Sequence, residues 1–418
     1  MTVELHTNEA PTRLRSRLSK VGPGLITAAT GVGAGDLVAA LVAGATLGMT
    51  FAWAIVVGAI LKYYLNEGVG RWQLSTGQTI LEGWNSMGKW ATSYFGIYSV
   101  LWGFVFGAAV SSSCALAMHA LFPQLPLWAW AIIHALIGFI LVWNGRYALV
   151  EKLMTIFVGI MFVTVVGTAI LLSPNLTALA LGMVPKVPEG SLMNALALIG
   201  GVGGSITMAS YGYWIREKGW NHRSWISIMR LDSAVAYIVT AIFTLSLLVV
   251  GAEFLFGTGI TLSGEQGLVQ LSSMLGERFN EPMRWLFLIG FWAASFTSLL
   301  GVWNGVPYLF ADFVRIMKKE PKNPEVVVEK TKPYRAYLIW LTFPSMLLLF
   351  IGKPVGLIMA YGALGALFMP FLALSLLWLL NSNRVEKQYR NPLWNNVMLA
   401  VCILLFIVLM INELRNIF

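Results

Sequence analysis

The sequence predicts an all-α polytopic membrane protein, and three observations carry that prediction. Of the 418 residues, 57% are hydrophobic and 11% are charged, and the mean hydropathy is +0.73. Apolar segments of about 20 residues, the length that a membrane-spanning helix needs, recur along the whole chain. The connections between these segments are short, so no room remains for a sizeable water-soluble domain.

Eleven segments have the length and hydropathy expected of a membrane span. An odd number of crossings places the two termini on opposite sides of the membrane. The predicted spans are 22–48, 50–70, 93–121, 125–143, 151–173, 190–214, 232–256, 283–312, 334–351, 354–381 and 392–412.

The distribution of the basic residues predicts which connecting segments lie on the cytoplasmic side of the membrane. Residues 1–21 are polar and basic and lack the apolar core of a secretory signal, so we expect a cytoplasmic tail. With that assignment 23 of the 28 Lys and Arg residues fall on inner segments, Lys62 and Arg71 among them. The positive-inside rule then favours a cytoplasmic N-terminus and an external C-terminus, in the plasma membrane or, in a bacterium, the inner membrane. The five outer basic residues are Lys186, Arg278, Arg284, Lys353 and Arg415.

The first span is interrupted by glycines and one carboxylate. Gly31, Gly33 and Gly35 alternate and allow the chain to unwind, and Asp36 stands where a second half-helix would begin. Non-helical backbone at membrane depth is tolerated only where it is buried in protein or lines a wet cavity, and an ionisable group there is costly. The stretch is therefore a candidate binding site. The alternative is that Asp36 only caps the second half-helix.

A second glycine-interrupted span, 190–214, follows five helices later. Because a five-helix offset inverts the topology, the two broken helices run in opposite directions and their centres can meet at the midplane. Such a pair is the best sequence indication of the binding site in transporters with inverted repeats, although glycines also serve ordinary helix packing. We therefore predict one transmembrane transporter domain, 1–418, with inverted five-helix repeats at 22–173 and 190–381 and a peripheral last helix at 392–418.

Three short motifs accompany this pattern. They are Gly22-Pro23-Gly24-Leu25 at the start of the first span, Ser75-Thr76-Gly77-Gln78 after the second, and Asn144-Gly145-Arg146 through Glu151-Lys152 between the fourth and fifth. With the eleven predicted spans, these motifs resemble the Nramp family of divalent-metal transporters, and the chain looks like a divergent branch with an altered metal site. The resemblance implies the LeuT-type fold with broken helices 1 and 6.

The resemblance also places the family's metal ligands on four positions. Where the family has Asp-Pro-Gly-Asn, this chain has Gly33-Ala34-Gly35-Asp36, so Gly33 takes the position of the ligand aspartate and Asp36 that of the ligand asparagine. Met208 keeps the family's thioether position, and Ser205 takes the position whose backbone carbonyl the family uses. The resemblance therefore implies a metal site at Asp36, Met208, Gly33 and Ser205.

The family's proton route is not kept. Its aspartate in helix 1 corresponds to Gly33, its acids in helix 3 correspond to Gly107 and Val110, and its histidine in helix 6 corresponds to Ser210. Because none of these residues can titrate, we expect proton coupling to be weak or absent, with Asp36 the sole proton acceptor at the site. A glutamine in helix 10 that helps close the family's site corresponds to Gly362.

The predicted function is secondary transport of divalent metal ions by alternating access. A carboxylate in a low-dielectric setting attracts a cation, and unwound carbonyls add hard oxygen ligands. The thioether of Met208 favours manganese or iron, whereas magnesium fits if the ion keeps its waters and Met208 only fills space. The alternative is a LeuT-fold transporter of a non-metal solute, such as a monovalent cation or a small organic cation or zwitterion, and a third is a non-transporting sensor or scaffold.

Other classes of protein find little support in the sequence. Walker, nucleophile-elbow and zinc-spacing motifs are missing, so we expect no enzyme, no catalytic residue and no cofactor besides the transported ion. The net charge of +9 follows from the short inner loops, so we expect no nucleic-acid partner, and no obligate protein partner is inferred besides the lipid bilayer. Glu67, Asp232 and Asp312 are interpreted as interfacial caps or partners of basic residues, and His134 as a packing histidine.

Overall fold

The computed structural model describes residues 11, 14–32, 34–144, 147–257, 265–323, 326–351 and 354–417, and the regular structure in these ranges is helical. Residues 1–10 of the predicted tail, Gly145 and Arg146 of the turn motif, and Lys353 lie outside the described residues. The helices are α1 (Leu14–Leu18), α2 (Pro23–Gly31), α3 (Ala34–Leu47), α4 (Ala52–Thr76), α5 (Ile80–Met87), α6 (Lys89–Leu121), α7 (Leu127–Asn144), α8 (Tyr147–Leu171), α9 (Leu176–Gly182), α10 (Leu192–Gly201), α11 (Thr207–Glu217), η1 (Arg223–Trp225), α12 (Ile226–Leu255), α13 (Glu265–Arg278), α14 (Glu281–Met317), η2 (Val328–Lys330), α15 (Lys332–Met346), α16 (Leu348–Ile351), α17 (Pro354–Asn381), η3 (Lys387–Tyr389) and α18 (Leu393–Ile417).

The helices confirm a polytopic membrane protein. Among the described residues, seven helices are long and apolar enough to cross a bilayer by length and composition: α6, α7, α8, α12 with η1, α14, α15 with α16, and α18. The other predicted spans correspond to α2 with α3, α4, α10 with α11, and α17. Two of these are divided into half-helices and α4 carries buried charges, so a count of eleven crossings stays a prediction.

Both glycine-interrupted spans are divided into two half-helices, as the sequence predicts, but α3 begins at Ala34, so Asp36 lies within its first turn and not at its cap. The first divides into α2 and α3, and the second into α10 and α11. Between α10 and α11 the backbone passes through Gly203 and Gly204, whose φ angles of +71° and +100° lie in the left-handed region that favours glycine. The glycines in this stretch therefore set the break itself.

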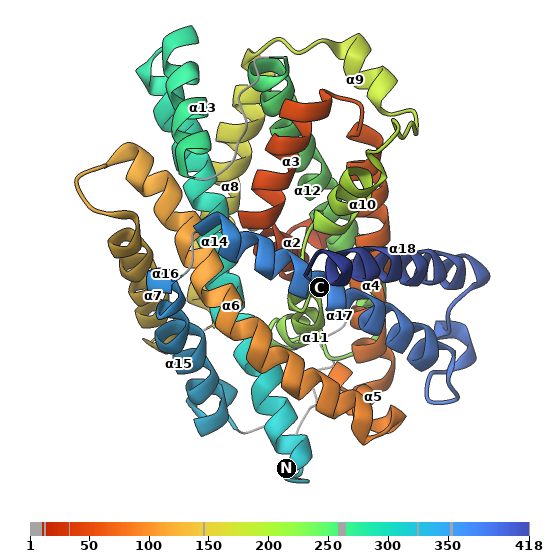
Figure 1. Ribbon diagram of the computed structural model, residues 1–418. Helices are drawn as coiled ribbons and strands as arrows, with labels where there is room; N and C mark the ends of the chain where they lie inside the picture. Colours follow the sequence, from red (N-terminus) through yellow and green to blue (C-terminus); the bar gives the residue numbers. More distant parts are fainter. Residues whose placement is uncertain are drawn as a thin grey trace.

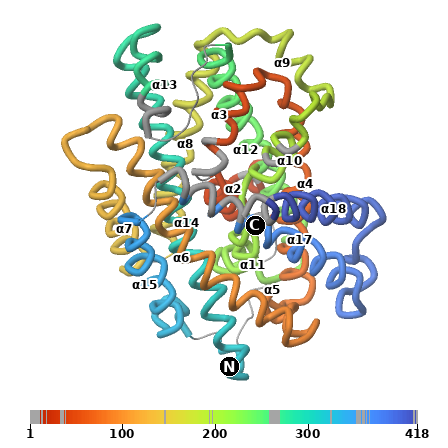
Figure 2. The backbone as a smooth tube through the Cα atoms, in the orientation of Figure 1, coloured from red at the N-terminus to blue at the C-terminus, as the bar shows by residue number. Residues whose placement is uncertain are grey.

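The broken helices lie inside the bundle. Figure 2 shows α2 and α11 in the middle of the bundle and α10 toward the side of α18, with α7 and α15 on the opposite side. α12 packs against α3, α4, α2 and α8, and α17 and α18 lie side by side as a hairpin at one edge (Figure 1).

Small residues let these helices approach closely. A Cβ atom on Gly44 of α3 would stand 2.2 Å from the Leu248 carbonyl oxygen, and one on Gly251 of α12 would stand 2.3 Å from the Leu41 carbonyl oxygen. This contact of two glycines with the facing backbone is the usual packing of helices in membranes.

Two of the basic residues counted on inner segments are not solvated. Lys62 and Arg71 are both buried within α4 at 1% exposure. Arg71 pairs with Glu67 one turn earlier, and Arg230 of α12 pairs with the same carboxylate. A count of loop charges cannot distinguish such residues from solvated ones, because burial is decided by packing. Without them 21 basic residues remain on inner segments against five outer ones.

Candidate functional site

The two breaks meet in the middle of the bundle. A Cβ atom on Gly31, the last residue of α2, would stand 2.2 Å from the Gly204 nitrogen and 2.3 Å from the Gly203 carbonyl carbon. No side chain fits in that space, so the backbone of the first broken helix rests directly on the backbone of the second. Glycine is required at this contact because any other residue would separate the two breaks.

Carbonyl groups at the breaks accept hydrogen bonds from the surrounding helices. The Ser298 hydroxyl of α14 donates to the Thr30 carbonyl at 2.7 Å, and the Tyr237 hydroxyl of α12 donates to the Gly203 carbonyl at 3.3 Å. The Lys62 ammonium of α4 donates to the Gly204 carbonyl. Each carbonyl oxygen has two lone pairs and keeps a second acceptor position. The breaks thus present oxygen atoms whose positions are fixed by three different helices.

Three hydroxyl groups beside the second break have no hydrogen-bond partner in the described part of the chain. They are the buried hydroxyls of Ser205, Thr207 and Ser210. Buried polar groups are nearly always hydrogen-bonded, and each unsatisfied one costs about 1–3 kcal/mol. Three of them within six residues indicate a place for a polar ligand, an ion or ordered water.

The structure describes two of the four predicted metal-site residues, Met208 and Ser205, in full. Met208 is fully buried in the first turn of α11, and a Cβ atom on Gly204 would lie 3.5 Å from its Cγ. The Ser205 carbonyl lies in the break and accepts the Met208 N–H at 3.1 Å. Gly33 lies outside the described residues, and Asp36 is described only as part of the α3 backbone. The structure therefore brings Met208 and Ser205 together at the break, and the side chain of Asp36 stays a prediction.

The predicted positions of the proton route are packing positions. A Cβ atom on Gly107 would stand 2.1 Å from the Leu341 carbonyl oxygen, because α6 and α15 touch there. No acidic side chain fits at Gly107, and Val110 is buried at 1% exposure. Gly362 lies in α17, but its surroundings are outside the description. Among the described residues there is no group of three or more His, Cys, Asp and Glu that could hold a metal ion.

His134 is a packing histidine, as its apolar helix predicts. Its Nδ1 lies 2.7 Å from the Trp130 carbonyl oxygen, and its Nε2 accepts the Trp292 indole N–H at 2.8 Å. With one nitrogen donating and the other accepting, the imidazole is neutral and fully engaged. His134 is therefore not available as a proton relay in this arrangement.

Asp232, which the sequence predicts to be an interfacial cap or ion-pair partner, connects three helices in the structure. It is fully buried and accepts the Gly22 N–H at 2.8 Å, the Gly24 N–H at 2.6 Å and the Tyr211 hydroxyl at 2.8 Å. The carboxylate thus lies at the positive N-terminal end of α2 and joins it to α11 and α12. A Cβ atom on Gly24 would lie 2.7 Å from Asp232 Oδ2, which explains part of the Gly-Pro-Gly motif. That motif was the available signal, but the partner lies more than 200 residues away.

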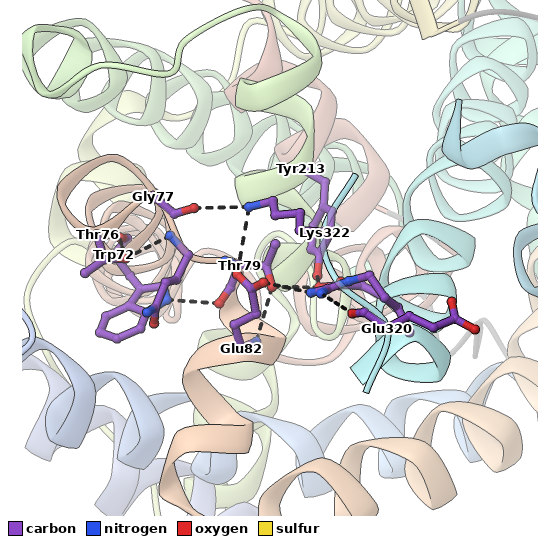
Figure 3. A network of polar contacts seen from close by, with 11 residues as sticks. Trp72, Thr76, Gly77, Thr79, Glu82, Tyr213, Glu320 and Lys322 are labelled. Atoms are coloured by element: carbon purple, nitrogen blue, oxygen red, sulfur yellow. Dashed lines mark hydrogen bonds and ion pairs between the residues drawn. The ribbon is translucent and has the colours of Figure 1, made fainter. Parts of the chain in front are cut away.

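The far end of α11 belongs to a polar network with α5 and α14 (Figure 3). The hydroxyls of Thr79 and Tyr213 both donate to Asp312 Oδ2 at 2.6 Å, and Arg315 bridges Asp312 and Glu82 at 2.7 Å. Thr79 and Glu82 also form a capping box at the start of α5. α11 is therefore fixed at the end that lies away from the break.

A lysine completes this network. Lys322 donates to the Gly77 carbonyl at 3.1 Å and lies 3.8 Å from the Glu82 carboxylate, as Figure 3 shows. Burial lowers the pKa of the Lys322 ammonium, and the neighbouring Glu82 carboxylate partly offsets that effect. The loop after α14 is thereby joined to the turn between α4 and α5.

Two broken helices that meet at the centre of a membrane bundle define a class, the LeuT-type fold of secondary transporters. Comparison with known proteins gives the family. The model of the natural resistance-associated macrophage protein-like family, Nramp, matches residues 24–415, and the chain belongs to that family.

Individual proteins are similar to the chain in sequence or in fold. The divalent metal cation transporter MntH of Staphylococcus saprophyticus is 23% identical over 93% of this chain and 90% of its own length. A solved structure of a manganese transporter mutant from Eremococcus coleocola has a TM-score of 0.79 at 17% identity, covering 98% of this chain and 89% of that one. The structure of MhsT in complex with L-phenylalanine has a TM-score of 0.55 at 14% identity, with 98% and 99% covered. At these identities the structural likeness shows the fold alone.

Proposed function

We propose that this protein is a secondary transporter of divalent metal ions that works by alternating access around the two breaks. The observation that carries the proposal is the contact of Gly31 with Gly203 and Gly204, beside the buried thioether of Met208 and three hydroxyls that have no partner in the described ranges. Fixed carbonyls and hydroxyls supply oxygen ligands, and helix breaks of this kind hold substrates in secondary transporters. We place the protein in the plasma membrane, or the inner membrane of a bacterium, with a cytoplasmic N-terminus and an external C-terminus.

The family supports metal transport, and the residues favour particular ions. Two relatives are named for a divalent metal cation and for manganese. A thioether ligand favours manganese or iron over calcium, and magnesium fits if it stays hydrated. Because Gly107, Val110 and Ser210 cannot exchange protons, we propose that proton coupling is weak or absent.

Uptake by the purified full chain in liposomes tests the proposal. We expect saturable Mn²⁺ influx with equal pH on both sides, and no accumulation of Mn²⁺ when only an inward proton gradient is imposed. Asp36→Asn keeps the size and capping ability of the side chain but removes its charge, so influx should be lost. Glu281→Gln is the control, because Glu281 is 65% exposed at the start of α14. Equal Mn²⁺ affinity in the wild type and Asp36→Asn, measured by calorimetry, would contradict the proposed site.

A second candidate is transport of a small zwitterion. The observation that favours it is the buried Lys62 ammonium at the break, which would pair with a substrate carboxylate. Binding of a zwitterionic amino acid by a protein that binds no Mn²⁺ would establish this candidate in place of metal transport.

A further inference from the structure

Lys62 is a charged residue in the middle of a membrane helix. It lies about 15 Å from the start of α4 and about 21 Å from its end, at a rise of 1.5 Å per residue. At 1% exposure its side chain does not reach water, so it does not behave like a lysine that extends from a helix end to the membrane surface. Ionisable residues buried at this depth mark functional sites by default.

The ammonium of Lys62 points at the second break. It donates to the Gly204 carbonyl, lies 3.9 Å from the Met369 Sδ of α17, and stands 5.4 Å from the centre of the Phe406 ring of α18. A carbonyl, a soft sulfur and an aromatic face all stabilise a cation. The second break, α17 and α18 thus supply a cation-binding environment, and Lys62 of α4 supplies the cation.

The Gly204 carbonyl belongs to the site proposed for the transported ion. Gly31 contacts Gly204, and Met208 packs against the same residue. A free cation that reaches this carbonyl meets the lysine ammonium, and the repulsion between them grows with the charge of the ion and falls with distance. An ion therefore binds there only when the ammonium moves away.

We infer that Lys62 is a specificity-determining residue whose ammonium acts as a tethered cation, occupying the Gly204 carbonyl until a substrate cation displaces it. The inference rests on the proposed function, because it names the competitor of the transported ion at that site. It makes divalent ions bind more weakly than the oxygen and sulfur ligands alone would allow. A purely structural lysine would have the opposite effect, since its removal would loosen the break and weaken binding.

Affinity for Mn²⁺ in two neutral variants separates these roles. Lys62→Met removes the charge and keeps an unbranched side chain, and Lys62→Gln keeps a hydrogen-bond donor. Leu65→Met is the matched control, because Leu65 is a fully buried residue of the same helix. By calorimetry on the purified full chain in nanodiscs, we expect both Lys62 variants to bind Mn²⁺ at least tenfold more tightly than the wild type. Unchanged or weaker binding in variants that keep the wild-type melting temperature overturns the inference.

A second measurement does not depend on metal transport. Lys62→Ala leaves the carbonyl without its ammonium, so methylammonium should raise the melting temperature of that variant with a saturable dose response and leave wild type and Leu65→Ala unchanged. If no protein in the series binds Mn²⁺, metal transport is refuted, and the methylammonium response alone decides the role of Lys62. Without that response in Lys62→Ala, and without tighter Mn²⁺ binding in the neutral variants, the tethered cation is refuted.

Discussion

The centre of the bundle and the α5 end differ in how their polar groups are paired. At the centre, the two breaks meet backbone to backbone, and three buried hydroxyls lack partners in the described part of the chain. At the α5 end, Arg315 pairs with Asp312 and Glu82, and the Tyr213 hydroxyl of α11 donates to Asp312. Figure 3 shows Tyr213 and Glu82 in this network, which holds α11 in place. Buried polar groups without hydrogen-bond partners are tolerated where a ligand will pair with them. Fully hydrogen-bonded networks hold in place the helices that carry those groups. The network at the α5 end therefore positions the distant site through α11, which connects the two regions as a rigid helix.

The largest effect is expected from a single methyl group at the contact of the breaks. Gly31→Ala places a Cβ atom 2.2 Å from the Gly204 nitrogen, so transport should be abolished and the free energy of unfolding should fall by about 1–3 kcal/mol. Gly159→Ala is the control, because no atom lies within 4 Å of its added methyl group and alanine favours the helix. Uptake and thermal melting measure both variants. Normal uptake by Gly31→Ala would mean that the breaks do not need to touch.

The next effect is a loss of stability at the start of α2. Asp232→Ala leaves the N–H groups of Gly22 and Gly24 without their acceptor, at about 1–3 kcal/mol each. It also removes the shorter of the two hydrogen bonds that the Tyr211 hydroxyl donates, the other acceptor being the Met229 carbonyl at 3.3 Å. We expect a loss of about 3 kcal/mol or more, and about 1 kcal/mol for Tyr211→Phe, which removes one of the three bonds. Thermal melting in one detergent measures both variants. Equal losses would show that the backbone bonds to Asp232 contribute nothing.

The network at the α5 end should respond more weakly because water reaches it. Asp312 is 10% exposed and Arg315 is 21% exposed, so Asp312→Asn should lower the free energy of unfolding by about 1–2 kcal/mol, less at high salt. Lys318→Met is the control, because its 4.0 Å pair with Glu320 is exposed on both sides and should change stability by less than about 0.5 kcal/mol. Melting curves at low and high salt measure both variants. Equal losses of stability in Asp312→Asn and Lys318→Met would contradict the prediction.

The smallest effect on stability is expected at the unpaired hydroxyls. Ser210→Ala and Thr207→Val each remove a buried hydroxyl that has no partner among the described residues, so stability should change by less than about 0.5 kcal/mol or rise slightly. If these hydroxyls face the substrate, the Kd for Mn²⁺ should rise several-fold in the same variants. A fall in stability as large as that of Asp312→Asn would show that the hydroxyls are paired in the folded protein.

Local signals in the sequence were enough to place the breaks. Glycines that interrupt an apolar run have the same meaning wherever they occur, because backbone freedom and membrane depth are properties of the segment itself. The contact between Gly31 and Gly204 was therefore within reach of prediction once two breaks lay five helices apart. The position of Asp232 was not, since its three partners come from two other helices.

By itself, the sequence determined the membrane class, the broken helices and the Nramp resemblance, because hydropathy, glycine spacing and short motifs are each written within one segment. Only the tertiary structure decided which charged side chains are buried and which are solvated. Lys62 looked like one more basic residue of the inner side, but packing of α4 against α10, α17 and α18 buries it and directs its ammonium to the Gly204 carbonyl. Whether a charge is solvated or buried depends on the helices that surround it, and that is a property of the whole bundle.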